Sequence, residues 1–519
     1  MFDGLRHSLR LLGILRILAR HDMLAALIAR RPGTPRGLAL ACRLLDRLCR
    51  RRHEARRTGQ RLAAALLELG PTFVKFGQAL SVRPDLVGED LALDLGQLRD
   101  RLEPFPAAAA RAAIEAELGR PVEELFSQFD DQAIAAASIA QVHFAVTTTG
   151  EEVAVKILRP GIEAAFRRDL DHFTWLAGLG LRFLPRLKRL RPLEALETIA
   201  RSMTIEMDLR LEGAAASELA DNFAGDPAFR VPKIDWQRTG RRVLTLEWVD
   251  GIPADDRESL IQAGHDLPEL AARVIRSFLG QALRDGFFHA DLHHGNLFVA
   301  ADGALVPVDF GIMGRLDPPT RLFMAEMLHA FLVGDWRRAA EVHFRAGYVP
   351  PGQSVEIFAQ ACRSIGEPIR DRPVADISIG RLLAQLFQIT ETFQMETQPQ
   401  LLLLQKTMVT AEGVARTLDP QVNFWEAARL PVAAWIRDNM GPEARLEQWG
   451  REALAGLKRL PALADRLERL GERLEGPGLR LEEASLERRA AAQARRRWPW
   501  LAAVTLVLAL ALALIILHA

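Results

Sequence analysis

The feature that most constrains this chain is the stretch at residues 286–311, GFFHADLHHGNLFVAADGALVPVDFG. It contains a carboxylate at Asp291, an amide five positions later at Asn296, and a second carboxylate at Asp309. The residues between Asn296 and Asp309 predict two short apolar strands, because a DG pair between apolar runs is typical of a hairpin turn. Such a hairpin would return Asn296 and Asp309 to the same end.

Phosphoryl-transfer sites use this combination of residues at this spacing. One aspartate lies near the acceptor group, and an asparagine and a second aspartate hold Mg²⁺ against the triphosphate. We therefore expect Asp291 to position the attacking hydroxyl or water, and Asn296 and Asp309 to bind Mg²⁺.

Three histidines in the same stretch invite a second interpretation. His289 and His293 have the i, i+4 spacing of a helical zinc pair. However, the Gly-Asn pair and the strand that follow favour a loop over a helix. We therefore expect His289, His293 and His294 to order this loop, with a zinc site as the alternative.

The segment GEEVAVKILRPG alternates as a strand and carries Lys156, which matches the lysine that contacts the α- and β-phosphates in kinases. The alternative is an ordinary surface lysine. Downstream, IEMDLRLEG supplies Glu206, Asp208 and Glu212 in a helix-forming run. In an unbroken helix, Asp208 and Glu212 share a face and Glu206 is rotated away. The three carboxylates are then expected to have two separate roles, unless they form a solvated acidic face.

The residues before the lysine strand read AIAAASIAQVHFA, residues 133–145, where a kinase would have a glycine-rich loop. Alanine methyl groups restrict how closely the backbone approaches phosphates. Nucleotide affinity and loop opening should therefore differ from those of a glycine-rich kinase. The predicted nucleotide contacts are Ala135, Ala136, Ala137, Ser138, Ile139, Ala140, Gln141, Val142 and Lys156.

Composition bounds the remaining possibilities. A chain of 519 residues with 49% hydrophobic and 26% charged residues is globular and can build a large core. The net charge of +1 provides no general basis for binding nucleic acid. The three cysteines, Cys42, Cys49 and Cys362, form no CxxC motif, which suits a reducing compartment.

Both ends of the chain suggest contact with a membrane. The first 31 residues have an arginine-interrupted apolar pattern, which predicts an amphipathic helix that lies on lipid or packs on its own domain. Near the other end, LAAVTLVLALALALIIL carries no charge, is about long enough to cross a bilayer, and follows three arginines. A C-terminal anchor with a cytoplasmic body is expected, and a buried terminal helix is the alternative.

Taken together, the motifs resemble those of the UbiB family, also called AarF or ADCK, of atypical protein-kinase-like proteins. The resemblance covers about residues 70–316 and rests on PTFVKFGQALSVRPDL, AAASIAQVH, VAVK, EMDLRLE, HADLHHGN and DFG. It implies an α+β, protein-kinase-like bilobal fold with a helical N-terminal extension and a C-terminal transmembrane helix. It also implies Mg²⁺-dependent ATP hydrolysis near membranes and a role in ubiquinone biosynthesis. Bacterial members often carry two membrane segments, whereas this chain shows one.

The resemblance gives a role to the KxGQ element, which includes Lys75 and Gln78. Its lysine would interact with Glu206 and Asp208 and hold the N-terminal extension over the active site. Glu212 would then pair with Lys156. Because this arrangement closes the site to proteins, the acceptor at Asp291 is expected to be water or a lipid hydroxyl.

The expected domains are an N-terminal extension at 1–105, a kinase-like domain at 106–440, a charged helical spacer at 441–497 and an anchor at 498–519. The kinase-like domain divides near residue 252 into a small lobe and a helical lobe. The expected cofactors are ATP and Mg²⁺. Expected partners are membrane lipid, quinone precursors and other ubiquinone-biosynthesis proteins, with a homodimer left open, at a bacterial inner membrane. The alternatives to an ATPase are a small-molecule or lipid kinase and a non-catalytic, nucleotide-switched scaffold.

Overall fold

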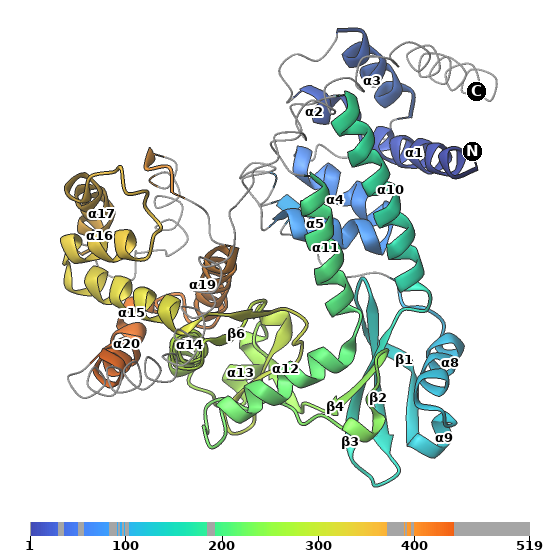
Figure 1. The fold of residues 1–519 in the computed structure, drawn as a ribbon. Helices are drawn as coiled ribbons and strands as arrows, with labels where there is room; N and C mark the ends of the chain where they lie inside the picture. Colours follow the sequence, from blue (N-terminus) through green and yellow to red (C-terminus); the bar gives the residue numbers. More distant parts are fainter. Residues whose placement is uncertain are drawn as a thin grey trace, which may run out of the picture. The chain divides into compact units, whose positions relative to one another are not determined.

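The computed structural model combines helices with antiparallel sheets (Figure 1). A four-stranded sheet in the order β1-β2-β3-β4 lies in the first half of the kinase-like region, and two smaller sheets follow it. The structure describes residues 2–29, 36–49, 57–81, 91, 94–95, 98, 103–183, 192–370, 389, 392–395 and 399–440.

The four-stranded sheet is built from antiparallel neighbours that place Lys156 in its interior. Lys156 lies opposite Val142 on one side and Leu244 on the other. Because strand side chains alternate between faces, Lys156 shares its face with Ala154 and Leu158. The strands are β1 Phe126–Ala136, β2 Ala140–Thr147, β3 Glu152–Leu158 and β4 Val243–Glu247.

The two faces of this sheet bury different cores. Val153, Val155 and Ile157 pack with α8 (Ala107–Leu118) and α9 (Val122–Leu125), which flank the sheet in Figure 1. The opposite face packs against α10 (Ile162–Phe183), α11 (Pro192–Glu206) and the start of α12 (Leu209–Asn222). The Lys156 side chain therefore leaves the sheet towards the helices that carry the acidic run.

The N-terminal helices form a small core of their own, which includes Ile14, Met23, Leu62 and Phe73. Phe73 also packs edge-on against Phe173 of α10. The helices are α1 Phe2–Arg20, α2 Leu24–Ala29, α3 Arg36–Cys49, α4 Thr58–Leu69 and α5 Pro71–Ser81.

The first helix resolves one of the alternatives left by the sequence. Ile14 and Ala19 of α1 are buried in the extension, whereas Leu9 and Leu12 are exposed. The helix therefore packs on its own domain, and contact of its exposed face with lipid stays a prediction.

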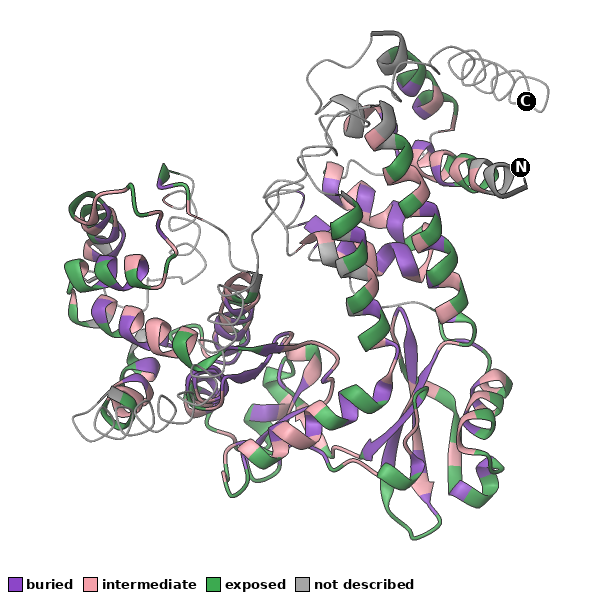
Figure 2. Ribbon diagram, viewed as in Figure 1, coloured by how far each residue is buried: buried purple, intermediate pink, exposed green. Residues whose placement is uncertain are grey.

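The second half of the kinase-like region is mostly helical, with one large core and a smaller separate core that includes Ala339 and Phe358. Figure 2 shows buried residues running through α14 and α19 and the short strands between them. The helices are α13 Arg257–Gln262, α14 Leu267–Leu279, α15 Pro318–Val333, α16 Trp336–Arg345, α17 Val355–Arg370, α19 Pro399–Leu418 and α20 Phe424–Met440.

The predicted hairpin is confirmed. Strands β7 (Leu297–Ala300) and β8 (Leu305–Pro307) pair antiparallel, and β5 (Gly251–Pro253) extends the sheet along β7. Gly303 turns the chain with a φ of +80°, in the left-handed region that glycine adopts without strain. A further pair, β6 (Phe287–His289) with β9 (Met313–Arg315), joins the two ends of the 286–311 stretch.

The acidic run is not one helix, so the predicted sharing of a face by Asp208 and Glu212 is wrong. Helix α11 ends at Glu206, and α12 begins at Leu209. Asp208 has an extended backbone and caps α12, because its carboxylate accepts a hydrogen bond from the Arg210 N–H.

Among the described residues, no helix is both long and apolar enough to cross a membrane. The predicted spacer at 441–497 and anchor at 498–519 lie outside the residues that the structure describes. Both stay predictions.

We expect the Phe288→Ala substitution to lower the free energy of unfolding by about 3–5 kcal/mol, because it leaves a cavity in the large core. Phe288 is fully buried on β6 and contacts Phe278 edge-on. Urea denaturation followed by circular dichroism measures the change. The control is Leu430→Ala, at a side chain that is 72% exposed, which should change stability by less than about 0.5 kcal/mol. Equal losses in the two variants would contradict this packing.

Candidate functional site

The site is centred on the ammonium group of Lys156, which lies between two carboxylates. Lys156 Nζ is 2.6 Å from Glu212 Oε1 and 3.2 Å from Asp309 Oδ1. The lysine comes from β3 and the glutamate from α12, while Asp309 follows β8 in the DFG segment. Three distant parts of the chain therefore meet at one buried cation.

Charge and burial set the protonation of this triad. Burial opposes the charged form of Lys156, but Asp309 and Glu212 outweigh it and raise the lysine pKa. Burial also raises the pKa of Glu212 to about 7, although the ammonium partly offsets it. For Asp309, burial is outweighed by Lys156 and by the Gly311 N–H, which lower the pKa. Asp309 is therefore the firmly ionised carboxylate of the two.

Asn296 and Asp309 have oxygen atoms available for a metal. The hairpin returns them to one end, where the Val308 N–H donates to the Asn296 carbonyl over 3.1 Å. The Asn296 amide nitrogen lies 3.4 Å from the Asp291 carbonyl, which leaves Asn296 Oδ1 without a hydrogen bond among the described residues. Asp309 uses Oδ1 for its bonds and its side chain is 44% exposed. Hard oxygen ligands of this kind suit Mg²⁺.

His289 orders the loop rather than binding zinc. Its Nε2 is hydrogen-bonded to the Asp309 carbonyl and must donate, because a carbonyl can only accept. Its Nδ1 accepts from the Asp291 N–H over 3.2 Å. Burial lowers the pKa of His289, which fits this neutral imidazole. A π-helical turn (Gly280–Asp285) also holds the His289 backbone, because the Gln281 side-chain oxygen accepts a hydrogen bond from the His289 N–H.

Of the other two histidines, His293 has a local role and His294 begins the turn that follows it. His293 accepts from the Gly295 N–H over 3.1 Å, at the start of a short 3-10 turn, His294–Asn296. No cluster of three or more metal-binding side chains occurs within the described ranges.

The alanine-rich segment forms a hairpin whose turn is residues 137–139, between β1 and β2. Ser138 is fully buried there, and its hydroxyl has no hydrogen-bond partner among the described residues. A buried unpaired hydroxyl is costly unless a ligand satisfies it. Because none of the Ser138 surface is exposed, a ligand does not reach this hydroxyl in the present conformation of the turn.

Not every predicted nucleotide contact faces the same way. Val142 shares the Lys156 face, whereas Gln141 points to the other face of the sheet. The Gln141 amide accepts from the Phe105 N–H over 2.8 Å and donates to the Phe105 carbonyl over 3.2 Å. The structure therefore does not bring the Gln141 side chain to the Lys156 site, because its amide anchors the segment before α8.

The KxGQ helix α5 reaches the acidic run through one of the two predicted partners. Lys75 Nζ is 2.9 Å from Glu206 Oε2. No ion pair joins Lys75 to Asp208 within the described residues, and Asp208 instead pairs with Arg210 at 2.7 Å. The break between α11 and α12 explains this correction, since it turns Asp208 into a helix cap. Gln78 donates to the Leu98 carbonyl over 3.3 Å.

The structure adds a residue that the sequence analysis missed. Lys406 of α19 places its ammonium 2.9 Å from Asp291 Oδ1. Only tertiary structure reveals this pair, because 115 residues separate the two positions.

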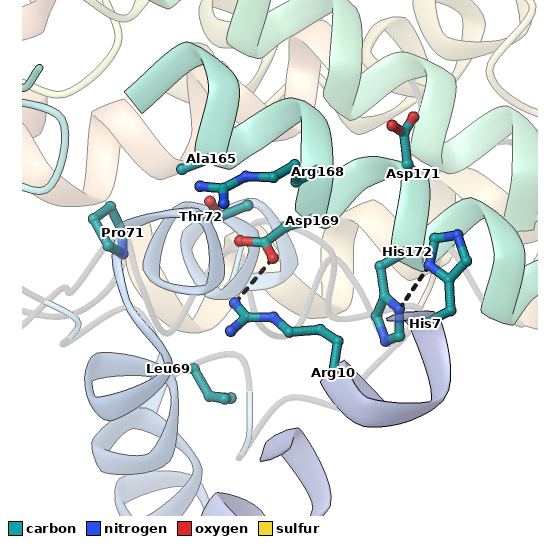
Figure 3. Close-up of a pocket in the computed structure, with 10 residues that line it drawn as sticks. All are labelled: His7, Arg10, Leu69, Pro71, Thr72, Ala165, Arg168, Asp169, Asp171 and His172. Carbon is teal, nitrogen blue, oxygen red and sulfur yellow. Dashed lines mark hydrogen bonds and ion pairs between the residues drawn. The ribbon is translucent and has the colours of Figure 1, made fainter. Parts of the chain in front are cut away.

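A separate pocket of about 570 Å³ lies where α1, α5 and α10 meet (Figure 3). Arg10 of α1 pairs with Asp169 of α10 at 2.9 Å, and His7 contacts His172 beside it. Pro71 and Thr72, at the start of the KxGQ helix, line this pocket, whereas Lys75, Gln78 and the residues of the Lys156 site do not. Its contacts hold the first helix against α10.

Comparison with known proteins places these residues in two recognised domains. Residues 97–343 match the ABC1 atypical kinase-like domain. This range contains every residue of the Lys156 triad, together with Asp291 and Asn296. Residues 362–423 match the UbiB helical domain, which includes Lys406. The α+β fold is therefore kinase-like, and such domains use ATP and a divalent metal in general.

Full-length relatives agree with the domain matches. A Marinobacter nauticus protein named "Probable protein kinase UbiB" is 43% identical over 409 residues, which is 78% of this chain and 75% of the relative. A protein of the same name from Azotobacter vinelandii is 42% identical over 421 residues, covering 80% and 78%. A solved erythromycin complex from Mycobacterium tuberculosis has a TM-score of 0.47 and 26% identity, covering 68% of this chain and 90% of the other.

The raised pKa of Glu212 predicts a pH-dependent stability. Between its ordinary value of 4.5 and about 7, the folded protein holds a proton that the unfolded chain releases. The contribution of this group to the free energy of unfolding is therefore full below pH 4.5 and is lost as the pH rises to about 7. We expect the melting temperature of the wild type, relative to Glu212→Gln, to fall across this window.

Thermal unfolding of both proteins from pH 4.5 to 8 measures the difference. Asp309→Asn serves as the control, because removing a neighbouring negative charge should lower the pKa of Glu212 and narrow the window. Parallel curves for the wild type and Glu212→Gln would contradict the assignment.

Proposed function

Because the chain belongs to the UbiB family of atypical kinase-like proteins, we propose that it hydrolyses ATP in a Mg²⁺-dependent reaction that supports ubiquinone biosynthesis. The observation that carries the proposal is the Lys156 ammonium held between Glu212 and Asp309, with Asn296 returned beside Asp309 by the hairpin. A kinase-type site needs this cation for the phosphates and these oxygens for the metal.

Each residue then has a chemical role. Lys156 binds the α- and β-phosphates while Glu212 holds it in place. Asn296 and Asp309 hold Mg²⁺, which would neutralise charge on the phosphate oxygens.

Asp291 acts on the attacking group. A water oxygen forms a bond to the γ-phosphorus, and the bond from that phosphorus to the β,γ-bridging oxygen breaks, leaving its electron pair on ADP. The water proton moves to the Asp291 carboxylate and from there to the released phosphate. The 31% exposure of the Asp291 side chain supports access by water.

The same exposure favours a second candidate, a kinase for small molecules or lipids. A hydroxyl group could occupy the position of the attacking water, and Asp291 would accept its proton in the same way. The Lys75–Glu206 ion pair, which ties α5 to α11, supports a site that is closed to protein acceptors. A scaffold that only binds nucleotide is the third candidate.

The proposal extends to location and partners. The apolar segment at 498–519 would anchor the chain in a bacterial inner membrane with its catalytic domain in the cytoplasm. Membrane lipid and quinone precursors would then be within reach, as would other ubiquinone-biosynthesis proteins or a second copy of this chain.

We expect Asp309→Asn to reduce phosphate release from ATP by about 100-fold or more, because it removes a carboxylate from the metal and from Lys156. Steady-state phosphate release by the purified full-length protein, with and without anionic liposomes, measures this. The matched control is Asp302→Asn at the exposed hairpin turn, which should retain wild-type turnover. A folded Asp309→Asn protein that releases phosphate at the wild-type rate would contradict the proposed ATPase activity.

Assays on the same purified protein distinguish the ATPase from the kinase and from the scaffold. Transfer of γ-phosphate label to an extracted lipid or quinone precursor would support the kinase. Nucleotide binding with negligible turnover, together with normal quinone levels in a deletion strain carrying Asp291→Asn, would support the scaffold.

A further inference from the structure

The acceptor side of the site lacks a cation in its own loop. Residues 291–296 read DLHHGN and contain no lysine or arginine. His293 Nε2 is 4.0 Å from Asp291 Oδ2, beyond hydrogen-bond distance. Lys156 is already engaged by Glu212 and Asp309. A positive charge beside Asp291 must therefore come from another element.

Helix α19 supplies that charge. Lys406 Nζ lies 2.9 Å from Asp291 Oδ1, and the two side chains are 37% and 31% exposed. Ion pairs with this much exposure add little to folding stability. Stability therefore does not explain why a lysine points at this aspartate.

Buried contacts on either side of Lys406 fix the position of its helix against the loop. The next residue, Thr407, is fully buried, and its hydroxyl lies 3.3 Å from the carbonyl oxygen of Ala290, to which it donates. Ala290 directly precedes Asp291, so α19 is bonded to the loop at two successive positions. Leu404, on the same helix, packs into the large core. The ammonium and the carboxylate are thus held in register by buried contacts.

The chain also uses lysine sparingly. Only six of its 67 lysine and arginine residues are lysines. Four of the six lie in the described residues, and three of these pair with motif carboxylates: Lys75, Lys156 and Lys406. Lysine presents a compact charge with three donors, whereas the guanidinium is a planar fork. The three paired lysines therefore fit positions that need a compact ammonium, whereas Lys233 is exposed.

We propose that Lys406 is a positioning residue for phosphoryl transfer. Its ammonium holds the Asp291 carboxylate towards the attacking oxygen. This role rests on the proposed function, and it makes the UbiB helical domain a part of the site rather than only a support for it.

The test compares Lys406→Met with Lys406→Arg and the wild type in full-length protein. We expect Lys406→Met to lower kcat for phosphate release by about 100-fold. The KM for ATP should change by less than about threefold, because the nucleotide is bound mainly elsewhere. Lys406→Arg should recover part of the rate, and the melting temperatures should match. The control is Lys233→Met, an exposed lysine away from the site, which should keep wild-type turnover.

A double-mutant cycle shows whether Lys406 acts through Asp291. In an Asp291→Asn background, Lys406→Met should cost much less than it costs in the wild type. A wild-type kcat in Lys406→Met would overturn the role of Lys406, as would a loss of kcat that comes with a lower melting temperature. The proposed function would still stand if turnover depends on Asp309. Absence of Asp309-dependent turnover in the wild type would overturn both.

Discussion

The structure depends on one buried cation shared by two carboxylates. Lys156 comes from the sheet, Glu212 lies 56 residues away on α12, and Asp309 lies 153 residues away in the DFG segment. Removing either carboxylate or the ammonium would leave a buried charge without full compensation, which is strongly unfavourable. The Phe310 N–H, which also donates to Glu212 over 3.3 Å, binds the same helix to the same loop. The strand that carries Lys156, the start of α12 and the DFG segment are therefore fixed relative to one another.

A short break between α11 and α12 separates Glu206 from Glu212, which lie six residues apart and bind different lysines. Glu206 ends α11 and meets Lys75 of the KxGQ helix, whereas Glu212 lies in the first turn of α12 and meets Lys156. Between them, Asp208 caps α12 and keeps the two helices distinct. The N-terminal extension and the Lys156 triad are thus connected through a single helix junction.

The acceptor side is assembled differently from the metal side. His289 bridges the Asp291 N–H and the Asp309 carbonyl, so the two aspartates are linked through one neutral imidazole. The Asp291 side chain is then held by Lys406 of α19, from outside the kinase-like match. Three of the scarce lysines therefore pair with carboxylates of the acidic motifs.

The sequence by itself determined the features that depend on neighbouring residues. The strand around Lys156 and the hairpin between Asn296 and Asp309 both follow from local periodicity and turn chemistry. Tertiary structure decided the rest: the break at Asp208, the burial of Gln141 on the sheet face away from Lys156, and the pairing of Lys406 with Asp291. Each of these depends on which distant atoms are available to satisfy a backbone or a charge. Local patterns carry no information about such partners, because the partners are chosen only when the chain packs.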